Sequence, residues 1–487
     1  MPVTVSRDKW ILYKHTCSYE MIKAVALDVK NSCKTDISDL ERHRMQERLT
    51  ALDLYKTRNP EERPLDSINH RINTLEFWMF GYEYKSGGEK KFIFSPLGNL
   101  FLKYIADEQK LRKIFIAMMF AMQFPHPANG TSHTFKLYPF RLVFKLLTDK
   151  RLNGTLYNYE EELLLPFVKE VTPESYERLV NEILELRKLT DEELVRRFQS
   201  DEHTYVNTVY EWEYYTQSLL SQVGVINKIA GETLCKLYHP SKTGTGSAPT
   251  GRKATKGSIT INSSCKRFIE DMLESYSCFD RPLNLRDPER LTIDCIKEIY
   301  SFYPETLLRE IGEPFELSRL LELPKLIEEY SNNPANGTAY LFEDVLAKGF
   351  DMFWNVEVVK RGGAGHTDIE CLYITKRKKF AVESKSSAYK LLGINAGRLR
   401  EQREEIGGEY TIVVTSRYVP ATLRDIKDCP IVILLASTFA EYLYNHIFHG
   451  VRDMDYADFD NIINDNLGRD ISKLISAMTL EKFAANS

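Results

Sequence analysis

The chain has 487 residues, which is too long for one hydrophobic core, so we expect several domains. Hydrophobic residues make up 43% and charged residues 28%, the composition of an ordinary soluble globular protein. The net charge of −4 excludes nucleic-acid binding through a strongly basic chain as a whole, so such binding would need local basic patches. The eight cysteines never fall in CxxC or CxxH spacing, which argues against a zinc or iron–sulfur site and suits a reducing cytoplasm.

Neither the N-terminal residues nor the longest apolar stretch predicts binding to a membrane. The first ten residues, MPVTVSRDKW, lack the apolar core of a signal peptide. The longest apolar stretch, residues 114–124, stops at Pro125 and is too short to span a bilayer. We therefore predict a buried helix there and a protein that works without a membrane.

Residues 38–105 have the pattern of a helix, a hairpin and another helix. A basic helix is predicted over 38–60, and a turn at 86–88 separates two short strands before a helix that begins near Ser95. One helical stripe precedes the hairpin and consists of Ile68, Ile72, Leu75 and Met79. This order is typical of a winged helix, so we predict a first winged-helix-type DNA-recognition domain over 1–150.

The helix face opposite that stripe carries Asn69, Arg71 and Asn73. These side-chain types can pair with base edges in a major groove, so we predict that they bind DNA. The alternative is a solvated helix face with no ligand.

A second winged-helix-type DNA-recognition domain is predicted over 151–265. Its helix spans 208–224 and ends at Gly224, with strands near 225–229, 233–238 and 258–262. The loop 239–257 between the last two strands contains no acidic residue and is rich in glycine and serine. We predict that this loop is mobile and contacts DNA phosphates; the alternative is a plain linker. Its basic residues are Lys242, Arg252, Lys253 and Lys256.

Residues 266–330 are predicted to form a helical connector, with helices broken at prolines. The breaking positions are Pro282, Pro288, Pro304, Pro314 and Pro324. Turn-forming residues at 331–338 mark the boundary to a C-terminal domain over 331–487. In this domain, helices are predicted over 338–353 and 386–406 and from Thr422, the second ending at a Gly-Gly pair, and further strands are predicted over 410–418 and 430–437.

The segment 361–390 carries the strongest chemical pattern of the chain. It predicts two strands joined by a basic turn, with Asp368 opening the first strand and Glu383 and Lys385 sharing one face of the second. Antiparallel pairing would bring Asp368 beside Glu383. Two carboxylates and an ammonium at the end of a sheet suit Mg²⁺-assisted phosphodiester hydrolysis, because hard cations bind oxygen ligands and activate water. The alternative is a surface hairpin with ordinary charges.

Glu343 is a further candidate ligand of the metal. It is predicted to lie on the apolar face of the helix 338–353, at helical spacing from Tyr340, Leu346, Ala347 and Phe350. An ionised carboxylate on such a face requires a metal or a lysine as its partner. The alternative is a carboxylate at the edge of the helix that reaches solvent.

The combined pattern resembles the AlwI-type family of type IIS restriction endonucleases, including nicking large subunits of heterodimeric enzymes. The resemblance covers most of the chain from about residue 60 and rests on 92–104, 123–125, 137–140, 342–350 and the segments around Asp368 and Glu383. Thr367 departs from the proline that often precedes the family's aspartate. The resemblance implies a prokaryotic cytoplasmic enzyme whose C-terminal α/β domain, with a mixed central sheet, is a restriction-endonuclease-like nuclease within a multidomain α+β chain.

Carried over from that family, Glu343, Asp368 and Glu383 would be metal ligands, and Lys385 would position or activate the attacking water. The expected activity is a sequence-specific, Mg²⁺-dependent cut in double-stranded DNA near or outside a short asymmetric site. The expected large subunit nicks one strand, and a small nuclease subunit or a second copy cuts the other. Two alternatives remain: a structure-selective repair or junction nuclease, and a winged-helix regulator with an inactive nuclease-like domain.

Overall fold

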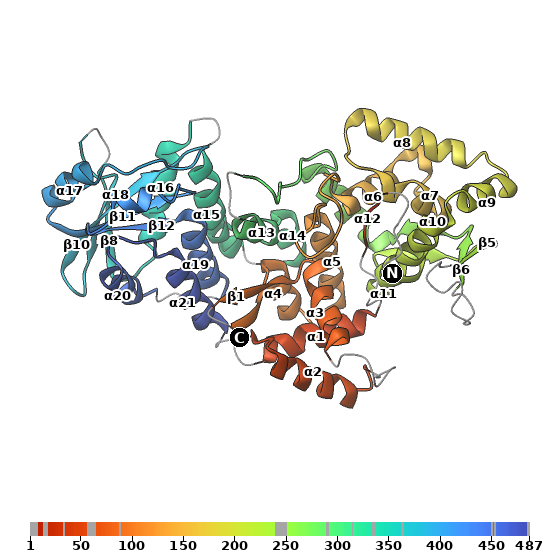
Figure 1. Ribbon diagram of the computed structural model, residues 1–487, viewed down its shortest axis with the longest axis horizontal. Helices are drawn as coiled ribbons and strands as arrows, with labels where there is room; N and C mark the ends of the chain where they lie inside the picture. The colour runs from red at the N-terminus through yellow and green to blue at the C-terminus, as the bar shows by residue number, and fades with distance from the viewer. Residues whose placement is uncertain are drawn as a thin grey trace. The chain divides into compact units, whose positions relative to one another are not determined.

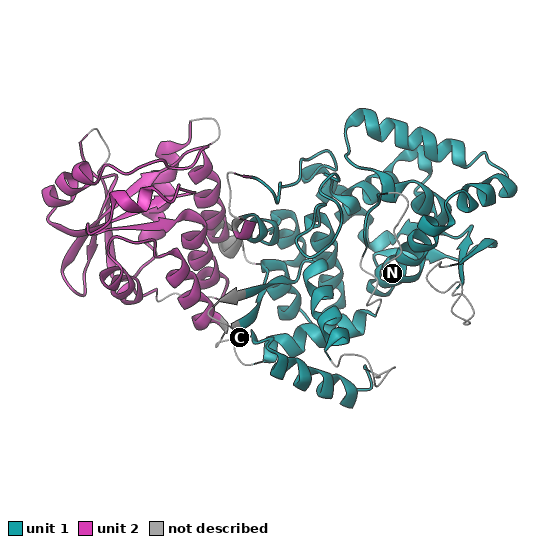
Figure 2. Cartoon of the chain, in the orientation of Figure 1, with its two compact units in different colours: residues 1–287, 295–312 teal, residues 288–294, 313–487 magenta. Residues whose placement is uncertain are grey.

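The computed structural model of this chain divides into two compact units, shown in two colours in Figure 2. Unit 1 comprises residues 1–287 and 295–312, and unit 2 comprises residues 288–294 and 313–487. The structure describes residues 8–12, 18–32, 35–55, 65–86, 89–238, 251–288, 292–313, 315–333, 337–361, 365–449, 451 and 454–484. The predicted subdivision of the N-terminal half into two recognition domains and a connector stays a prediction.

Unit 2 starts before the predicted boundary at 331–338. The reason is helix α15 (Phe315–Asn332), which packs against α16 (Ala339–Phe350) and α19 (Ala436–Phe448) of the same unit. Pro324 lies inside α15 and does not end it, which corrects the predicted helix break at that position. The turn-forming residues of 331–338 therefore separate two packed helices of one unit.

The first part of unit 1 is helical with one hairpin (Figure 1). Its elements are α1 (Tyr19–Asn31), α2 (Asp39–Ala51), α3 (Asp66–Phe77), β1 (Gly81–Ser86), β2 (Glu89–Phe94), α4 (Pro96–Lys103) and α5 (Glu108–Ala121). The stripe predicted here is confirmed in part: Ile68, Ile72 and Leu75 are buried on α3, whereas Met79 is buried beyond its end, with a φ of 68°. Strands β1 and β2 pair antiparallel, and the Ser95 side chain caps α4 by accepting a hydrogen bond from the Gly98 amide. The predicted helix, hairpin and helix are thus present, although residues 87–88 of the turn lie outside the described part.

Helix α5 contains the apolar stretch that the sequence analysis assigned to a buried helix. Every residue from Ile114 to Ala121 is buried, which confirms that prediction. Across the described ranges, no helix combines the length and the apolar character that crossing a membrane requires.

The second part of unit 1 combines helices with five short strands. The helices are α6 (Pro139–Thr148), α7 (Asn158–Leu163), α8 (Pro173–Leu186), α9 (Asp191–Gln199), α10 (Glu202–Val209), α11 (Gln217–Val223), α12 (Ser263–Ser275), α13 (Thr292–Tyr300) and α14 (Glu305–Ile311). The strands are β3 (Thr155–Tyr157), β4 (Ile226–Ile229), β5 (Thr233–Tyr238), β6 (Gly251–Thr255) and β7 (Ser258–Ile261). They form a three-stranded sheet in the order β3-β7-β4 and a separate β5-β6 pair.

Strand β6 corrects the predicted loop 239–257, because its second part is a strand paired antiparallel with β5. Ala254 on β6 and Leu237 on β5 are both fully buried in a cluster with Val206 and Val209 of α10. One small apolar residue among glycine and basic residues gave too weak an alternation to reveal the strand. Residues 239–250 lie outside the described part, so the predicted mobility is not addressed there.

The helix predicted over 208–224 is present but changes its geometry in the middle. A π-helical segment, Tyr210–Thr216 (η4), separates α10 from α11. Gly224 ends α11 with a φ of 81°, a left-handed conformation that glycine adopts without steric cost, so the predicted helix stop is confirmed.

Helix α7 carries three consecutive glutamates that are fully buried, Glu160, Glu161 and Glu162. Glu160 accepts a hydrogen bond from Arg187 at 2.7 Å, and Glu161 accepts one from Gln217 at 2.6 Å. Burial raises the pKa of Glu161 to about 8 and raises that of Glu162 well above its ordinary value. These two carboxyl groups therefore hold their protons at neutral pH in the folded chain.

Replacing Glu161 by Gln should make the melting temperature less sensitive to pH. A raised folded-state pKa stabilises the fold at low pH, and this stabilisation is lost as pH rises from about 4.5 towards about 8, at most about 1.4 kcal/mol per pH unit for one proton. Glutamine cannot ionise, so Glu161→Gln should melt increasingly above the parent as pH rises through this window. The matched control is Glu182→Gln on the exposed surface of α8. If the melting temperatures of parent and variant depend on pH in the same way, the raised pKa of Glu161 is wrong.

Unit 2 is built on one five-stranded mixed sheet, which confirms the mixed central sheet predicted for this part. Its strands are β8 (Val356–Lys360), β9 (Ile369–Tyr373), β10 (Lys378–Lys385), β11 (Gly408–Thr415) and β12 (Ile431–Leu435). Their order is β12-β11-β10-β9-β8; the first three are parallel, whereas β9 runs antiparallel to both its neighbours. The remaining helices are α17 (Ala396–Glu405), α18 (Thr422–Asp425), α20 (Ala457–Asp465) and α21 (Ser472–Ala484).

Helices cover both faces of this sheet, with α17 on one side and α15 and α19 on the other in Figure 1. Alternate residues of each strand serve the two faces. Val413 and Ile433 pack with Leu399 of α17 on one side. On the other side an aromatic core forms, in which the ring of Phe380 stacks on Tyr456 with centroids 4.7 Å apart. Burial on both faces makes β10 a rigid support for the residues at its end.

Two features of unit 2 differ from the prediction. Strand β8 was missed, because its five residues include a glutamate and end in a lysine. The helix predicted over 386–406 begins only at Ala396, where Asn395 caps it by accepting a hydrogen bond from the Arg398 amide. The preceding residues are extended instead, since Leu391 exchanges backbone hydrogen bonds with Arg417 and Val419. Gly407, with a φ of 67°, ends α17 as predicted.

Candidate active site

The structure places Asp368 directly across from Glu383. Strands β9 and β10 pair antiparallel as far as Ile369 opposite Val382, and Asp368 and Glu383 are the next residues of the two segments. The charge of Asp368 acts on Glu383, so the two lie close together as antiparallel pairing predicted. The basic turn between the strands is also present, at residues 374–377. The two carboxylates thus meet because the register of one hairpin fixes them.

Asp368 is held in place by Ser384, the residue between Glu383 and Lys385. Its Oδ2 atom accepts a hydrogen bond from the Ser384 amide at 2.7 Å and another from the Ser384 hydroxyl at 2.8 Å. Thr367, the residue before Asp368, is also held against β10, because it is buried and its hydroxyl donates to the Val382 carbonyl at 3.3 Å. Both hydrogen bonds to Asp368 use one oxygen, so Oδ1 takes no part in them.

Glu383 is buried, with 1% of its surface exposed, beside the ammonium group of Lys385. Lys385 Nζ donates to Glu383 Oε1 at 2.5 Å, which confirms that the two side chains share a face. The other oxygen, Oε2, is buried and has no hydrogen-bond partner among the described residues. Burial raises the pKa of Glu383, and the negative charge of Asp368 raises it further, against the opposing charges of Lys385 and Arg398. Glu383 is therefore a buried carboxyl group with a second carboxylate and a lysine as its charged neighbours.

Glu343 on α16 reaches the same group of charges. Burial raises its pKa first, and the negative charges of Asp368 and Glu383 add to the effect, so the three carboxylates lie close enough to interact. Lys360 Nζ lies 3.7 Å from Glu343 Oε2 and acts in the opposite direction. The expected apolar surroundings are only partly present, because Tyr340 is 60% exposed and Glu343 lies at the edge of the buried face. The lysine partner that the sequence analysis allowed is present.

The donor set fits a hard divalent cation in chemistry and in charge. It offers carboxylate oxygens, which Mg²⁺ prefers, and one of them is a buried oxygen of Glu383 without a partner. Burial raises the pKa values of Glu343 and Glu383 most, and the neighbouring carboxylates raise them further, so a bound cation would favour the ionised form of both groups. Within the described ranges, no group of three or more His, Cys, Asp or Glu side chains is already arranged to hold a metal ion.

Helix α17 contributes contacts that the sequence analysis did not find. The buried Gln402 donates through Nε2 to the His366 carbonyl at 2.6 Å, and Glu405 Oε1 lies 2.9 Å from His366 Nδ1. These contacts attach the helix to the backbone two residues before Asp368. The same helix carries Arg398, whose charge acts on Glu383. No motif in the sequence indicated Gln402, because its partner is a backbone atom.

Among the residues predicted to bind DNA in unit 1, Asn69, Arg71 and Asn73 all lie half-buried on α3. Asn69 Oδ1 accepts a hydrogen bond from Arg42 at 2.5 Å, and Arg42 also binds Glu83 at 2.7 Å. Part of this helix face therefore already contacts α2 and β1 of the protein itself. The role of the three residues in DNA binding stays a prediction.

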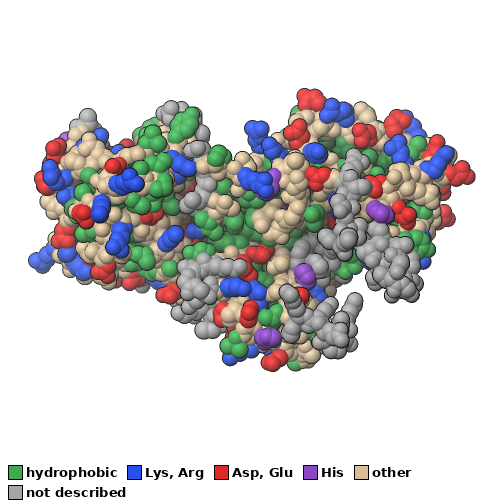
Figure 3. Space-filling view, in the orientation of Figure 1, with side chains coloured by type: hydrophobic (Ala, Val, Ile, Leu, Met, Phe, Trp, Pro, Cys, Tyr) green, Lys and Arg blue, Asp and Glu red, His purple; other side chains and the backbone are tan. Residues whose placement is uncertain are grey.

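The basic residues predicted for the loop 239–257 differ in their positions and contacts. Lys242 lies outside the described part, whereas Arg252 and Lys253 stand on strand β6. Lys256 Nζ forms an ion pair with Asp191 at 2.5 Å. On the face drawn in Figure 3, basic and acidic side chains are mixed on each unit, in keeping with the small net charge. Any DNA contact by these residues is therefore local.

Comparison with known proteins shows the family to which this chain belongs. Residues 5–276 match the family described as "Type II restriction endonuclease HgaI, N-terminal domain". The chain is 46% identical over 476 residues to the type II restriction enzyme HgaI of Avibacterium volantium, covering 97% of each protein. A match of this identity over nearly the full length shows common membership. The chain belongs to the HgaI family of type II restriction endonucleases.

Solved structures give weaker similarities. The binding domain of the BpuJ1 endonuclease, solved with modified DNA, aligns with a TM-score of 0.39 and 14% identity over 61% of this chain and 96% of that one. The restriction endonuclease FokI aligns with a TM-score of 0.28 and 10% identity over 95% of this chain and all of that one. Its DNA-bound form aligns with a TM-score of 0.27 and 12% identity over 96% of this chain and all of that one.

Proposed function

We propose that this chain is a type IIS restriction endonuclease that cuts double-stranded DNA with Mg²⁺. Membership in a type II family makes it a site-specific deoxyribonuclease. The observation that carries the rest is the proximity of Asp368 to Glu383 and Lys385 at the end of β10. Asymmetric recognition and cleavage near or outside the site are the properties of the AlwI-type enzymes that the sequence resembles, and this subclass is part of the proposal.

Each residue of the site has a chemical task in this proposal. Asp368, Glu383 and Glu343 would hold Mg²⁺, which supplies an activated water and neutralises charge on the scissile phosphate. Ser384 keeps Asp368 oriented through its two hydrogen bonds to Oδ2. Lys385 orients the attacking water and offsets the charge of Glu383, its neighbour at 2.5 Å. In unit 1, Asn69, Arg71 and Asn73 would contact bases, and Lys242, Lys253 and Lys256 would contact phosphates.

Family membership disfavours the two alternatives. A repair or junction nuclease would cut by DNA shape without a fixed sequence, unlike the type II enzymes to which this chain belongs. A regulator with an inactive domain would be expected to lose a member of the candidate site. The positions Glu343, Asp368, Glu383 and Lys385 all retain residues with the required chemistry.

The purified chain should nick one strand in each encounter with its site. One cluster around Asp368 and Glu383 provides one hydrolytic centre, whereas the two strands of a duplex present scissile phosphates of opposite polarity. The chain at nanomolar concentration, with Mg²⁺ and supercoiled plasmid bearing one site, should therefore accumulate open-circular DNA. Run-off sequencing of both strands should place the nick at a fixed distance from an asymmetric sequence.

Complete cleavage would then require a second nuclease domain, and we propose a small partner subunit for this role, with a second copy of the chain as the other source. Adding more of the chain alone distinguishes them, because only self-association makes linear product depend on its concentration. Linear product that appears at once, without a nicked intermediate and without dependence on concentration, would rule out the single-strand mechanism. No fixed cleavage sequence on any plasmid would instead refute the restriction activity.

A further inference from the structure

The π-helical segment Tyr210–Thr216 gives unit 1 an aromatic surface of unusual geometry. π-Helical turns are rare and occur often at functional sites, because the extra residue in the turn re-aims the side chains. Here the Thr216 hydroxyl donates to the Glu211 carbonyl at 2.8 Å inside the widened turn. The segment places Tyr210 and Tyr214 with ring centroids 6.0 Å apart, and Tyr214 is 39% exposed.

Arg252 of strand β6 lies against this aromatic pair. Its guanidinium carbon is 4.0 Å from the centroid of the Tyr210 ring and 5.5 Å from that of Tyr214. Among the described residues it forms no ion pair, in contrast to Lys256, which binds Asp191. A planar guanidinium held over aromatic rings keeps its charge and most of its donors while it loses rotational freedom. Arg252 is thus oriented before any ligand arrives.

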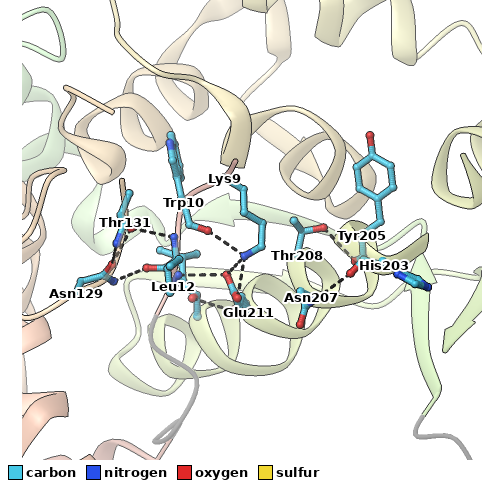
Figure 4. Close-up of polar contacts among 12 residues, drawn as sticks. Lys9, Trp10, Leu12, Asn129, Thr131, His203, Tyr205, Asn207, Thr208 and Glu211 are labelled. Carbon is cyan, nitrogen blue, oxygen red and sulfur yellow. Dashed lines mark hydrogen bonds and ion pairs between the residues drawn. The ribbon is translucent and has the colours of Figure 1, made fainter. Parts of the chain in front are cut away.

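The residue next to Tyr210 in the chain, Glu211, forms a buried ion pair with Lys9 (Figure 4). Lys9 Nζ donates to both carboxylate oxygens of Glu211, at 2.9 and 2.7 Å, and Glu211 directly follows Tyr210. The Leu12 amide donates to the same carboxylate at 3.2 Å. On the other side of the segment, Lys228 Nζ donates to the Glu213 carbonyl at 2.7 Å. These contacts anchor the segment at two points of unit 1.

We infer that Arg252 reads a guanine base in the duplex, with Tyr210 and Tyr214 as the support that orients it. This inference rests on the proposed DNA recognition by unit 1. A phosphate does not require an oriented fork, because a lysine also binds it as a point charge. A guanine presents two acceptors, O6 and N7, which an oriented guanidinium fork binds together. The neighbouring Lys253, exposed on the same strand, is suited to a phosphate contact.

The test compares Arg252→Lys with the parent in DNA binding, using duplexes that carry the site defined by run-off sequencing of parent cleavage. Lysine keeps the charge but loses the planar fork, so affinity for the specific duplex should fall about 5- to 150-fold. Affinity for a random duplex should stay the same. Tyr210→Leu, which removes the supporting ring and keeps Arg252, should lower specific affinity in the same direction. The matched control is Arg196→Lys on the exposed face of α9, which should change neither affinity.

A set of duplexes with single base-pair changes gives the sharper result. Arg252→Lys should lose discrimination at one G·C pair and keep it at every other position. Unchanged binding to both duplexes, or an equal loss of specific and random binding, would overturn the inference, because neither a phosphate contact nor a position outside the interface discriminates between bases. A parent protein that prefers no sequence at all would refute the proposed function itself. This result concerns the parent and is therefore distinct from any result for the Arg252→Lys variant.

Discussion

Asp368→Asn is expected to abolish DNA cleavage while leaving sequence-specific binding within a few-fold of the parent. Asparagine keeps the shape of the side chain but removes the charge of a proposed metal ligand. Losing such a ligand removes several kcal/mol of transition-state stabilisation, which corresponds to a rate loss of at least about 10³-fold. Binding should survive because the residues proposed to read DNA lie in unit 1, whereas Asp368 lies in unit 2. The measurement pairs single-turnover cleavage with a binding assay on the same duplex.

Substitutions at neighbouring residues separate the loss of a metal ligand from the loss of a group that orients Asp368. Glu383→Gln should match Asp368→Asn in severity, since Glu383 is buried and its Oε2 has no hydrogen-bond partner among the described residues. Ser384→Ala should cost less, because the amide hydrogen bond to Asp368 remains when the hydroxyl is removed. The control is Asp458→Asn on the exposed surface of α20, which makes the same chemical change in the same unit. Near-parental cleavage by Asp368→Asn or Glu383→Gln would disprove the site assignment.

Glu211→Gln is expected to destabilise unit 1 strongly. The Lys9–Glu211 pair is buried, with 5% of each side chain exposed, and its atoms approach to 2.7 Å. Removing one charge of a buried pair leaves the other without compensation and costs about 3–5 kcal/mol of unfolding free energy. Figure 4 shows the lysine ammonium between the Glu211 carboxylate and the Trp10 carbonyl, which accepts from it at 3.0 Å. Chemical denaturation of the variant and the parent, followed by tryptophan fluorescence, measures the loss.

The double variant Lys9→Met with Glu211→Leu distinguishes an uncompensated charge from lost packing. Apolar residues of similar size avoid burying any charge, so this variant should recover most of the stability lost by Glu211→Gln. The control pair is Glu185 on α8 and Lys188 just after its end, which are mostly exposed, and Lys188→Met should cost no more than about 1 kcal/mol. A Glu211→Gln protein as stable as the Lys188→Met protein would show that the buried pair has little effect on folding.

Local patterns in the sequence correctly predicted the two strands that carry the candidate site. Side chains alternate with a period of two along a strand, so Glu383 and Lys385 had to share a face, and their contact confirms this. Helix ends were equally visible, because Gly224 and Gly407 adopt the positive φ that ends a helix at these positions. Such features depend on a few neighbouring residues and are therefore readable without the fold.

Weak local patterns led to errors. Strand β6 was assigned to a loop, because its only inward-facing apolar anchor is Ala254 and its partner β5 lies beyond the residues 239–250. Pro324 was predicted to break a helix, yet α15 continues through it and packs on α16 and α19. In both places tertiary contacts outweigh the intrinsic preference of one or two residues.

The sequence by itself determined the candidate site of this protein: carboxylates and a lysine at strand spacing around Asp368 and Glu383. Only the tertiary structure decided what surrounds that chemistry. Gln402 reaches the His366 carbonyl across 36 positions, and Lys9 pairs with Glu211 across 202 positions. Neither pair leaves a spacing pattern, because a contact between distant segments depends on how helices and strands pack. Burial, which raises the pKa values of Glu343 and Glu383, is likewise a property of that packing.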